Sequence, residues 1–329
     1  MKAKKSMLPT PADLTLDEIQ SRFGTDEKAR AYLEEIRWPH GPTCPHCNDL
    51  KRRVWSIERN PEKKIRAGLY QCANEKCKKQ FTVTVGTIFE DSHIPLRKWL
   101  VAWYLLCSSK KGISSLQIQR MLGLGSYRTA LFMMHRIRYA LSQPEFVSFL
   151  KGVVEMDETY IGGKIHGKGT GSHTPNKTCV VSLVERGGTA RSFVMDRVTS
   201  ENLHRKIDEH VVEGSIVVTD DYFGYRKMPP VYDHRAVKHS AKEYSRKEGD
   251  FNVNTNTVES KFSLLKRGIV GTFHSVSKKH LPLYLAEFDY RFNERKTTDG
   301  ERTVTGIKKA EGKRLTLKPL KNGLQQPTK

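Results

Sequence analysis

The 329-residue sequence has no apolar run long enough to cross a membrane. Its longest apolar run, from Trp99 to Cys107, is about half of the ~20 residues that a membrane-spanning helix needs. The basic residues at the start of the chain are not followed by the apolar segment of a secretory signal. We therefore predict an intracellular, cytoplasmic protein with no membrane partner.

Acidic residues are also scarce relative to basic ones. Asp and Glu number 36 against 57 Lys and Arg, which gives a formal net charge of +21. A Lys or Arg that neutralises a phosphate releases a condensed counterion, so such an excess favours a polyanionic partner. The basic residues are spread along the chain and not gathered on one amphipathic segment, which disfavours a membrane surface. We predict that the protein binds nucleic acid.

Cysteines are few, and four of the six lie in two close pairs, Cys44-x2-Cys47 and Cys72-x4-Cys77. In the reducing environment inside a cell, such pairs indicate metal ligands rather than disulfides. Four thiolates on two short loops suit the tetrahedral coordination of Zn²⁺ and predict a zinc ribbon, although the second pair is longer than the common CxxC. We expect His46 to belong to the metal-binding turn or to contact DNA rather than to bind the metal.

The segment of the predicted ribbon is rich in basic residues. They are Arg52, Arg53, Lys63, Lys64, Arg66, Lys76, Lys78 and Lys79. Contact with DNA phosphate is one interpretation. The alternative is a zinc site that only stabilises the fold beneath a solvated basic face. Cys107 and Cys179 lie in apolar runs and are expected to be buried thiols.

Helical patterns flank the predicted ribbon on both sides. Two short helices are expected before it, the second capped by Asp26, and Trp38-Pro39 ends this segment. After it, residues 95–106 are apolar nearly all round, which predicts a buried helix.

Residues 113–138 read as a helix-turn-helix. A helix over residues 113–123 is followed by a Gly-containing turn, and Ser126 caps a second helix that carries Arg128, Arg136 and Arg138. These arginines favour DNA contact. A pair of helices that only pack against their neighbours is the alternative.

From about residue 152, the pattern changes to strands and helices. Strands are expected at 153–160, 178–185, 191–198, 215–220 and 235–239, with a helix capped by Ser200 and further helices at 255–267 and 279–295. This order is that of an RNase H-like α/β core, a mixed sheet flanked by helices. The first and fourth strands of that core lie side by side.

Three acidic residues fall at informative places in this order. Asp157 and Asp220 end strand-like runs, and Glu259 lies on a predicted helix. A single Asp is more often a surface or capping residue, but carboxylates brought from two strands and a helix suit a two-metal phosphoryl-transfer site. Mg²⁺ suits such oxygen ligands. Lys266, seven residues after Glu259, shares its helix face, and Asn256 lies one turn before it.

Three segments carry a resemblance to a known family: VEMDETYIGGK, VVTDDYFGY and NTNTVESKFSLLKRGIVGTFHSVSKKHLPLYLAEFDYRFNER. They resemble the DDE transposases of bacterial insertion sequences, most closely the IS1595 (ISXO2-like) family with an N-terminal zinc ribbon. The resemblance covers roughly residues 20–300. It implies an RNase H-like catalytic core and DNA cleavage and joining, dependent on two Mg²⁺ or Mn²⁺ ions, at the inverted-repeat ends of a mobile element.

The resemblance assigns site residues one by one. Asp157 matches the first acid, Asp220 the second, Glu259 the third, and Lys266 the basic residue seven positions on. Asp221 is an alternative to Asp220 because Gly often follows the second acid in the family. Some relatives carry Asn as the third ligand, so Asn256 is an alternative to Glu259.

The sequence thus predicts a DNA transposase that binds double-stranded DNA, works as a homo-oligomer and is associated with the nucleoid. An RNase H-like nuclease without strand transfer and a zinc-ribbon DNA-binding regulator are the alternatives. The expected regions are an N-terminal helical segment (1–40), the zinc ribbon (41–86), a helix-turn-helix-like DNA-binding segment (87–148), the catalytic domain (149–300) and a basic C-terminal tail (301–329).

Overall fold

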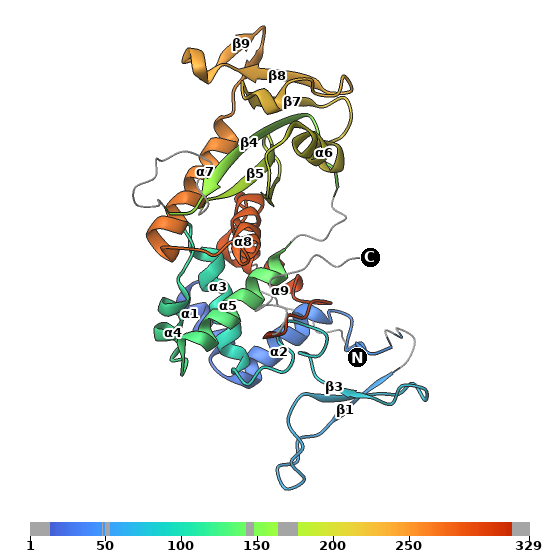
Figure 1. The fold of residues 1–329 in the computed structure, drawn as a ribbon. Coiled ribbons are helices and arrows are strands. Elements are labelled where there is room, and N and C mark those ends of the chain that lie inside the picture. The colour runs from blue at the N-terminus through green and yellow to red at the C-terminus, as the bar shows by residue number, and fades with distance from the viewer. Residues whose placement is uncertain (1–13, 48, 50–52, 143–147, 164–176, 318–329) are drawn as a thin grey trace. The chain divides into compact units, whose positions relative to one another are not determined.

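The computed structural model describes residues 14–47, 49, 53–142, 148–163 and 177–317 (Figure 1). The chain forms two compact units, which are treated separately below. The first comprises Met1–Leu141 with Lys296–Lys329, and the second comprises Ser142–Arg295. Arg52, residues 1–13 and residues 318–329, the end of the tail predicted to be basic, lie outside the described residues. Among the helices described, none combines the length and apolar character that a bilayer crossing requires.

Two short helices open the first unit, α1 (Leu16–Phe23) and α2 (Asp26–Arg37). Threonines cap both, and the hydroxyl of Thr25 accepts a hydrogen bond from the backbone N–H of Lys28 at 3.2 Å. The prediction that Asp26 caps α2 is therefore wrong by one residue. Asp26 lies in the first turn of α2, where a negative charge stabilises the helix dipole.

A small antiparallel sheet follows α2. It consists of β1 (Val54–Ile57), β2 (Leu69–Cys72) and β3 (Gln80–Phe81). On one face of this sheet, the ring of Tyr70 stacks on that of Phe81, and both rings pack edge-on against Trp38. The aromatic residue that ends α2 therefore forms part of the core of the sheet.

The remainder of the first unit is helical and consists of α3 (Leu96–Ser108), α4 (Ser115–Leu122), α5 (Tyr127–Leu141) and α9 (Asp299–Lys308). Trp99, Trp103 and Cys107 of α3 are fully buried, which confirms the prediction of a buried helix with a buried thiol. Most of helix α9 lies in the segment expected to be a basic tail (301–329), and the helix packs on α3. There Arg302 donates a hydrogen bond to the carbonyl of Cys107 at 2.9 Å.

The helix-turn-helix geometry is present, but most of its second helix is buried. Gly123 takes the left-handed conformation between α4 and α5, and the Ser126 hydroxyl accepts from the N–H of Thr129 as expected of a cap. Arg136 and Arg138 are buried, so the prediction that they contact DNA is wrong. The Arg136 guanidinium instead donates to the carbonyl of Glu90 at 2.6 Å. Arg128 is exposed.

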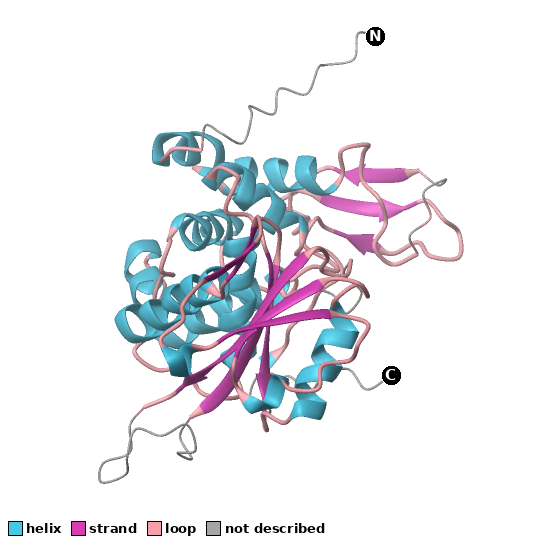
Figure 2. Ribbon diagram, turned by 90° about the horizontal axis from the view of Figure 1, so that it is seen from above, coloured by secondary structure: helices cyan, strands magenta, loops and turns pink. Residues whose placement is uncertain are grey.

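The second unit is built on a five-stranded mixed sheet (Figure 2). Its strands are β4 (Val153–Ile161), β5 (Thr178–Glu185), β6 (Ala190–Met195), β7 (Ile216–Asp220) and β8 (Asp233–Val237). Their order is β6-β5-β4-β7-β8, with β4 parallel to β7 and β7 parallel to β8. The predicted pairing of the first and fourth strands is confirmed.

Helices cover both faces of this sheet (Figure 2). Helix α6 (Ser200–His210) covers one face, where Leu203 and Ile207 pack with Met156. Helices α7 (Asn256–Gly268) and α8 (Leu281–Asn293) cover the other face. Thr199 caps α6, one residue before the predicted cap.

The sheet and its helices are the predicted α/β architecture. The hairpin of β9 (Arg246–Glu248) and β10 (Phe251–Val253), which lies between β8 and α7, was not predicted. Its strands are only three residues long, too short for an alternating pattern to show in the sequence.

Candidate functional site: four cysteines and three carboxylates

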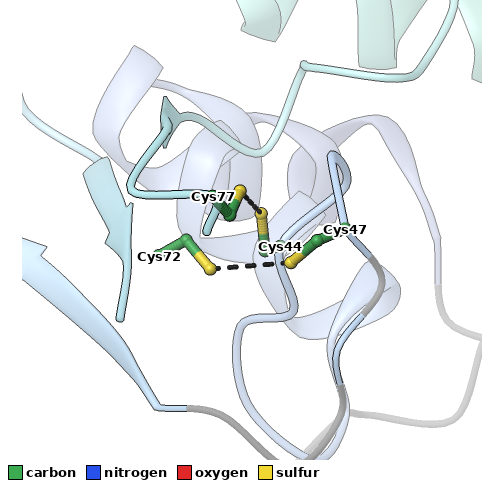
Figure 3. A group of neighbouring side chains, drawn as sticks. All are labelled: Cys44, Cys47, Cys72 and Cys77. Carbon is green, nitrogen blue, oxygen red and sulfur yellow. Dashed lines mark hydrogen bonds between the residues drawn. The ribbon is translucent and has the colours of Figure 1, made fainter. Parts of the chain in front are cut away.

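The four predicted zinc ligands come together in the first unit. The side chains of Cys44 and Cys47 point toward those of Cys72 and Cys77 from two separate loops (Figure 3). The Sγ atoms of Cys44 and Cys77 are 3.8 Å apart, and those of Cys47 and Cys72 are 3.6 Å apart. Zn–S bonds of about 2.3 Å give a tetrahedron with edges of about 3.8 Å. The donor set and its spacing therefore fit zinc.

Backbone groups of the second loop are directed at the sulfur atoms. The N–H of Asn74 donates to Sγ of Cys72 at 3.4 Å, and the N–H of Cys77 closes a turn onto the carbonyl of Asn74 at 2.9 Å. A backbone N–H from Lys79 holds the pKa of Cys77 below its ordinary value, whereas desolvation raises the pKa of Cys72 to about 12. The ring of His46 lies against Phe81, consistent with a residue of the turn.

The basic side chains around this cluster are exposed. Of the eight predicted to surround it, seven lie in the described part of the chain: Arg53, Lys63, Lys64, Arg66, Lys76, Lys78 and Lys79. They give the zinc-ribbon region a positive surface that can attract phosphate.

Asp157 and Asp220 are brought together by the pairing of β4 with β7. Glu155 is paired with Val218 in the parallel register, so two residues further on Asp157 lies beside Asp220. Side chains alternate along a strand, which places Asp157 on the same face as Glu155. That is the face covered by α7, because the carboxylate of Glu155 accepts hydrogen bonds from the first turn of α7.

The pKa shifts of Asp157 and Asp220 agree with the positions that the strand register gives them. Burial, with added repulsion from Glu158, Asp220 and Glu259, raises the pKa of Asp157 to about 7. Burial also raises the pKa of Asp220, against a hydrogen bond from the N–H of Tyr222 at 3.0 Å. Close carboxylates disfavour one another's ionisation, and a bound cation reverses that effect.

Glu259 lies in the first turn of α7 and is partly exposed. Its carboxylate accepts a hydrogen bond from the hydroxyl of Thr255 at 2.6 Å. Asn256 is the exposed first residue of α7, and Lys266 is exposed two turns after Glu259 on the same helix. Across the described residues, the four cysteines alone have ligand atoms within 4.8 Å of one another, so the three carboxylates are more widely spaced.

Asp221 differs from its neighbour Asp220. Its carboxylate accepts a hydrogen bond from the hydroxyl of Ser240, and this bond lowers the pKa of Asp221. Alternation along the end of β7 directs the two side chains to different sides. The contacts of Asp220 and Asp221 therefore favour Asp220 as the partner of Asp157.

Glu158 follows Asp157 but faces away from α7. Its carboxylate accepts a hydrogen bond from the hydroxyl of the buried Tyr225 at 2.5 Å, and burial raises its pKa. Tyr225 belongs to the core on the α6 side of the sheet.

Glu155 is a functional candidate that the sequence reasoning missed. Its side chain is fully buried, and its carboxylate accepts hydrogen bonds from the N–H groups of Thr257 and Val258 at 2.8 and 3.0 Å. Arg186 forms an ion pair with it at 2.6 Å and also donates to the carbonyl of Asn254. Glu155 therefore fixes the N-terminus of α7, which carries Glu259, to the strand that carries Asp157. An acid two residues before Asp157, and so on the same face of the strand, was the available signal.

His239 was also missed. Its Nε2 lies 3.8 Å from Oε1 of Glu259, and its proximity lowers the pKa of Asp220 against the larger effect of burial. That nitrogen is shielded from solvent and has no hydrogen-bond partner among the described residues. A lone His after a short strand gives no signal in the sequence.

The chain matches two family models and one curated relative. Residues 149–293 match the family model of the ISXO2-like transposase domain, and residues 24–80 match that of the transposase zinc-ribbon domain. The chain is 29% identical over 292 residues to an uncharacterized protein in the transposable element ISH50 of Halobacterium salinarum. That alignment covers 82% of this chain and 91% of the relative.

Proposed function

Because the chain belongs to the IS1595 (ISXO2-like) family of insertion-sequence transposases, we propose that it binds the inverted repeats of its element and cuts and joins DNA there. The observation that carries this proposal is the parallel pairing of β4 with β7, which sets Asp157 beside Asp220 on the face covered by α7. Glu259 on α7 completes the proposed catalytic group, and burial, with repulsion from the neighbouring carboxylates, raises the pKa of Asp157.

Asp157, Asp220 and Glu259 would hold two Mg²⁺ or Mn²⁺ ions. The oxygen-only donor set fits these ions, and the mutual repulsion of the carboxylates favours a cation among them. When bound, two such ions activate the attacking oxygen and stabilise the departing one. Lys266, exposed two turns further along α7, would contact the phosphate backbone of the DNA beside the site.

The proposed reaction has two steps. In the first, water attacks a phosphodiester at the element's end, the bond from phosphorus to the 3′ oxygen breaks, and a 3′-OH and a 5′-phosphate remain. In the second, that 3′-OH loses its proton and attacks a phosphodiester of the target DNA, which releases the target's own 3′-OH. Neither step needs a covalent bond between protein and DNA.

The first unit would bind the repeats. Zinc held by the four cysteines would fix the ribbon, whose exposed basic residues would contact phosphate. The exposed Arg128 at the start of α5 is a further candidate contact. Two ends must be brought together for transposition, so we propose that the working form is a homo-oligomer that acts on nucleoid DNA in the cytoplasm.

The test uses duplexes that carry the element's own terminal repeat, with Mg²⁺ or Mn²⁺. Wild-type protein should nick this DNA and join the 3′ ends to target DNA. Asp157→Asn should abolish both reactions and leave binding to the repeat intact, whereas Asp221→Asn is the matched control and should keep both. Cutting without joining would favour a nuclease. Wild-type protein that binds the repeat and does neither reaction would favour a DNA-binding regulator.

A further inference from the structure

The three-stranded sheet of the zinc-ribbon region has two unlike faces. The pairing register places Trp55 of β1 opposite Gln71 of β2, and Gln71 opposite Gln80 of β3. These three side chains therefore form a row across the sheet. The adjacent row contains Tyr70 and Phe81, whose rings pack against Trp38. Because side chains alternate along a strand, the Trp55–Gln71–Gln80 row lies on the face opposite this aromatic core.

The row is open to solvent. Trp55 is 58% exposed, Gln80 is exposed and Gln71 is partly exposed. The amide nitrogen of Gln71 lies 3.4 Å from the carbonyl of Lys78, a long hydrogen bond that a better acceptor can replace. A large exposed aromatic side chain beside two carboxamides is typical of a binding surface, because Trp is enriched where a partner covers it.

The surroundings of the row are basic. Arg53 lies two residues before Trp55 and is exposed, and Lys78 and Lys79 are exposed immediately before Gln80. Together with the net charge of +21, these residues favour DNA as the occupant. The charges are suited to phosphates, whereas the row between them carries no charge and is suited to base edges.

We propose that the Trp55–Gln71–Gln80 row reads base edges in the terminal-repeat duplex, with the glutamines on adenine and Trp55 against a thymine methyl group. Strands can enter the major groove, Gln forms paired hydrogen bonds with adenine there, and apolar side chains contact the thymine methyl. This inference rests on the proposed function and assigns the recognition of the repeat to one face of the ribbon. Arg53 and Lys78 position the sheet on the DNA and carry no sequence information.

The experiment measures dissociation constants for two duplexes over a range of salt concentrations. One carries the element's terminal repeat, and the other is a shuffled duplex of the same composition. Gln71→Ala and Gln80→Ala should each weaken binding to the repeat by roughly five- to a hundred-fold, the range for one paired contact, and leave binding to the shuffled duplex unchanged. Arg53→Ala is the matched control. It should weaken binding to both duplexes alike and reduce the slope of log affinity against log salt concentration by about one.

A change of preference distinguishes base reading from a structural role. Glu accepts a hydrogen bond from cytosine, so Gln80→Glu should shift the preferred base at one repeat position from adenine to cytosine. Zinc content and thermal unfolding verify that each variant is folded. If Gln71→Ala loses its zinc, the test rests on Gln80→Ala, because Gln80 is exposed.

Two results would overturn the inference. If both alanine variants keep the wild-type ratio of repeat to shuffled binding, this face does not read the sequence, and repeat cleavage by the same proteins shows that the proposed function stands. If wild-type protein neither prefers nor cuts the repeat, the inference and the proposed function fail together.

Discussion

The cysteine cluster and the carboxylate cluster are assembled in different ways. Each half of the cysteine cluster comes from residues close in the sequence, Cys44 with Cys47 and Cys72 at the end of β2 with Cys77, and the four sulfur atoms already lie within 4.8 Å of one another. The carboxylates of Asp157, Asp220 and Glu259 come from two strands and a helix and remain more widely spaced. Local loops can therefore set the geometry of a metal site by themselves, whereas the second site depends on the whole fold of its unit.

The two clusters also differ in electrostatics. Desolvation raises the pKa of Cys44 and Cys72, which favours their uncharged thiols, whereas a backbone N–H from Lys79 lowers the pKa of Cys77. Carboxylates are ionised under ordinary conditions and repel, which contributes to the raised pKa of Asp157. The comparison suggests that zinc is needed for the folding of the ribbon, whereas the carboxylate site folds without metal at some cost in stability.

Loss of zinc should have the largest effect. Cys72→Ser removes one of four thiolates, and structural zinc contributes about 10–16 kcal/mol of apparent binding free energy in small zinc domains. We expect the ribbon to lose its zinc and unfold, as seen by zinc content and by NMR, while the second unit keeps its fold. Cys107→Ser, which changes a buried thiol outside the cluster, should keep the zinc. Full zinc content in Cys72→Ser would contradict the four-ligand site.

Breaking the Glu155–Arg186 pair should have the next largest effect. Glu155→Gln leaves the partly buried guanidinium of Arg186 without its counter-charge and weakens the hold on the N-terminus of α7, so we expect a loss of roughly 3 kcal/mol in the free energy of unfolding. We also expect the Mn²⁺ concentration for half-maximal cleavage to rise about ten-fold or more, as for other residues that orient metal ligands.

Lys261→Met is the matched control for Glu155→Gln. Lys261, also on α7, forms a buried ion pair with Asp289 at 2.8 Å, away from the first turn of the helix. Its loss should destabilise the protein by a similar amount and leave the Mn²⁺ requirement unchanged. Equal shifts in Mn²⁺ requirement for both variants would mean that Glu155 acts only through stability.

A smaller effect is expected from the charge of Asp157 in metal-free protein. Its pKa is about 7 in the folded protein against 3.8 ordinarily, so its contribution to stability is full below 3.8 and is lost progressively until the pH has risen through about 7. Asp157→Asn should therefore stabilise the metal-free protein by roughly 1–3 kcal/mol at pH 8 and by less at pH 5, measured by urea unfolding with EDTA. A destabilised variant at pH 8 would contradict the raised pKa of Asp157.

The smallest effect is expected at Asp221. Its carboxylate accepts a hydrogen bond from Ser240 and none from the proposed catalytic group, so Asp221→Asn should change the cleavage rate by no more than a few fold. Asp220→Asn should abolish cleavage. If Asp221→Asn abolishes cleavage and Asp220→Asn does not, Asp221 is the second catalytic acid.

The sequence predicted those features whose cause is local or periodic. The close cysteine pairs predicted the zinc cluster, and the order of strands and helices, which is that of an RNase H-like core, predicted the pairing that sets Asp157 beside Asp220. The position of Glu155 gave a signal, but the contacts of Glu155 and His239 with α7 could not be predicted, because only the tertiary fold creates them.

The burial of Arg136 could not be predicted for a similar reason. A basic residue on a helix normally indicates an exposed face, but here the guanidinium packs over the ring of Trp99 and bonds to a backbone carbonyl. Helix α9 was missed because its segment is polar, and the capping box of Thr298 with Glu301 was the signal available in the sequence.

The most direct test of the central claim is the number of Mn²⁺ ions bound per chain in the presence of terminal-repeat DNA, measured by electron paramagnetic resonance. We expect about two ions for wild-type protein and for Asp221→Asn. We expect fewer for Asp157→Asn, Asp220→Asn and Glu259→Gln. The same number of ions in all five proteins would contradict a shared metal site formed by these three carboxylates.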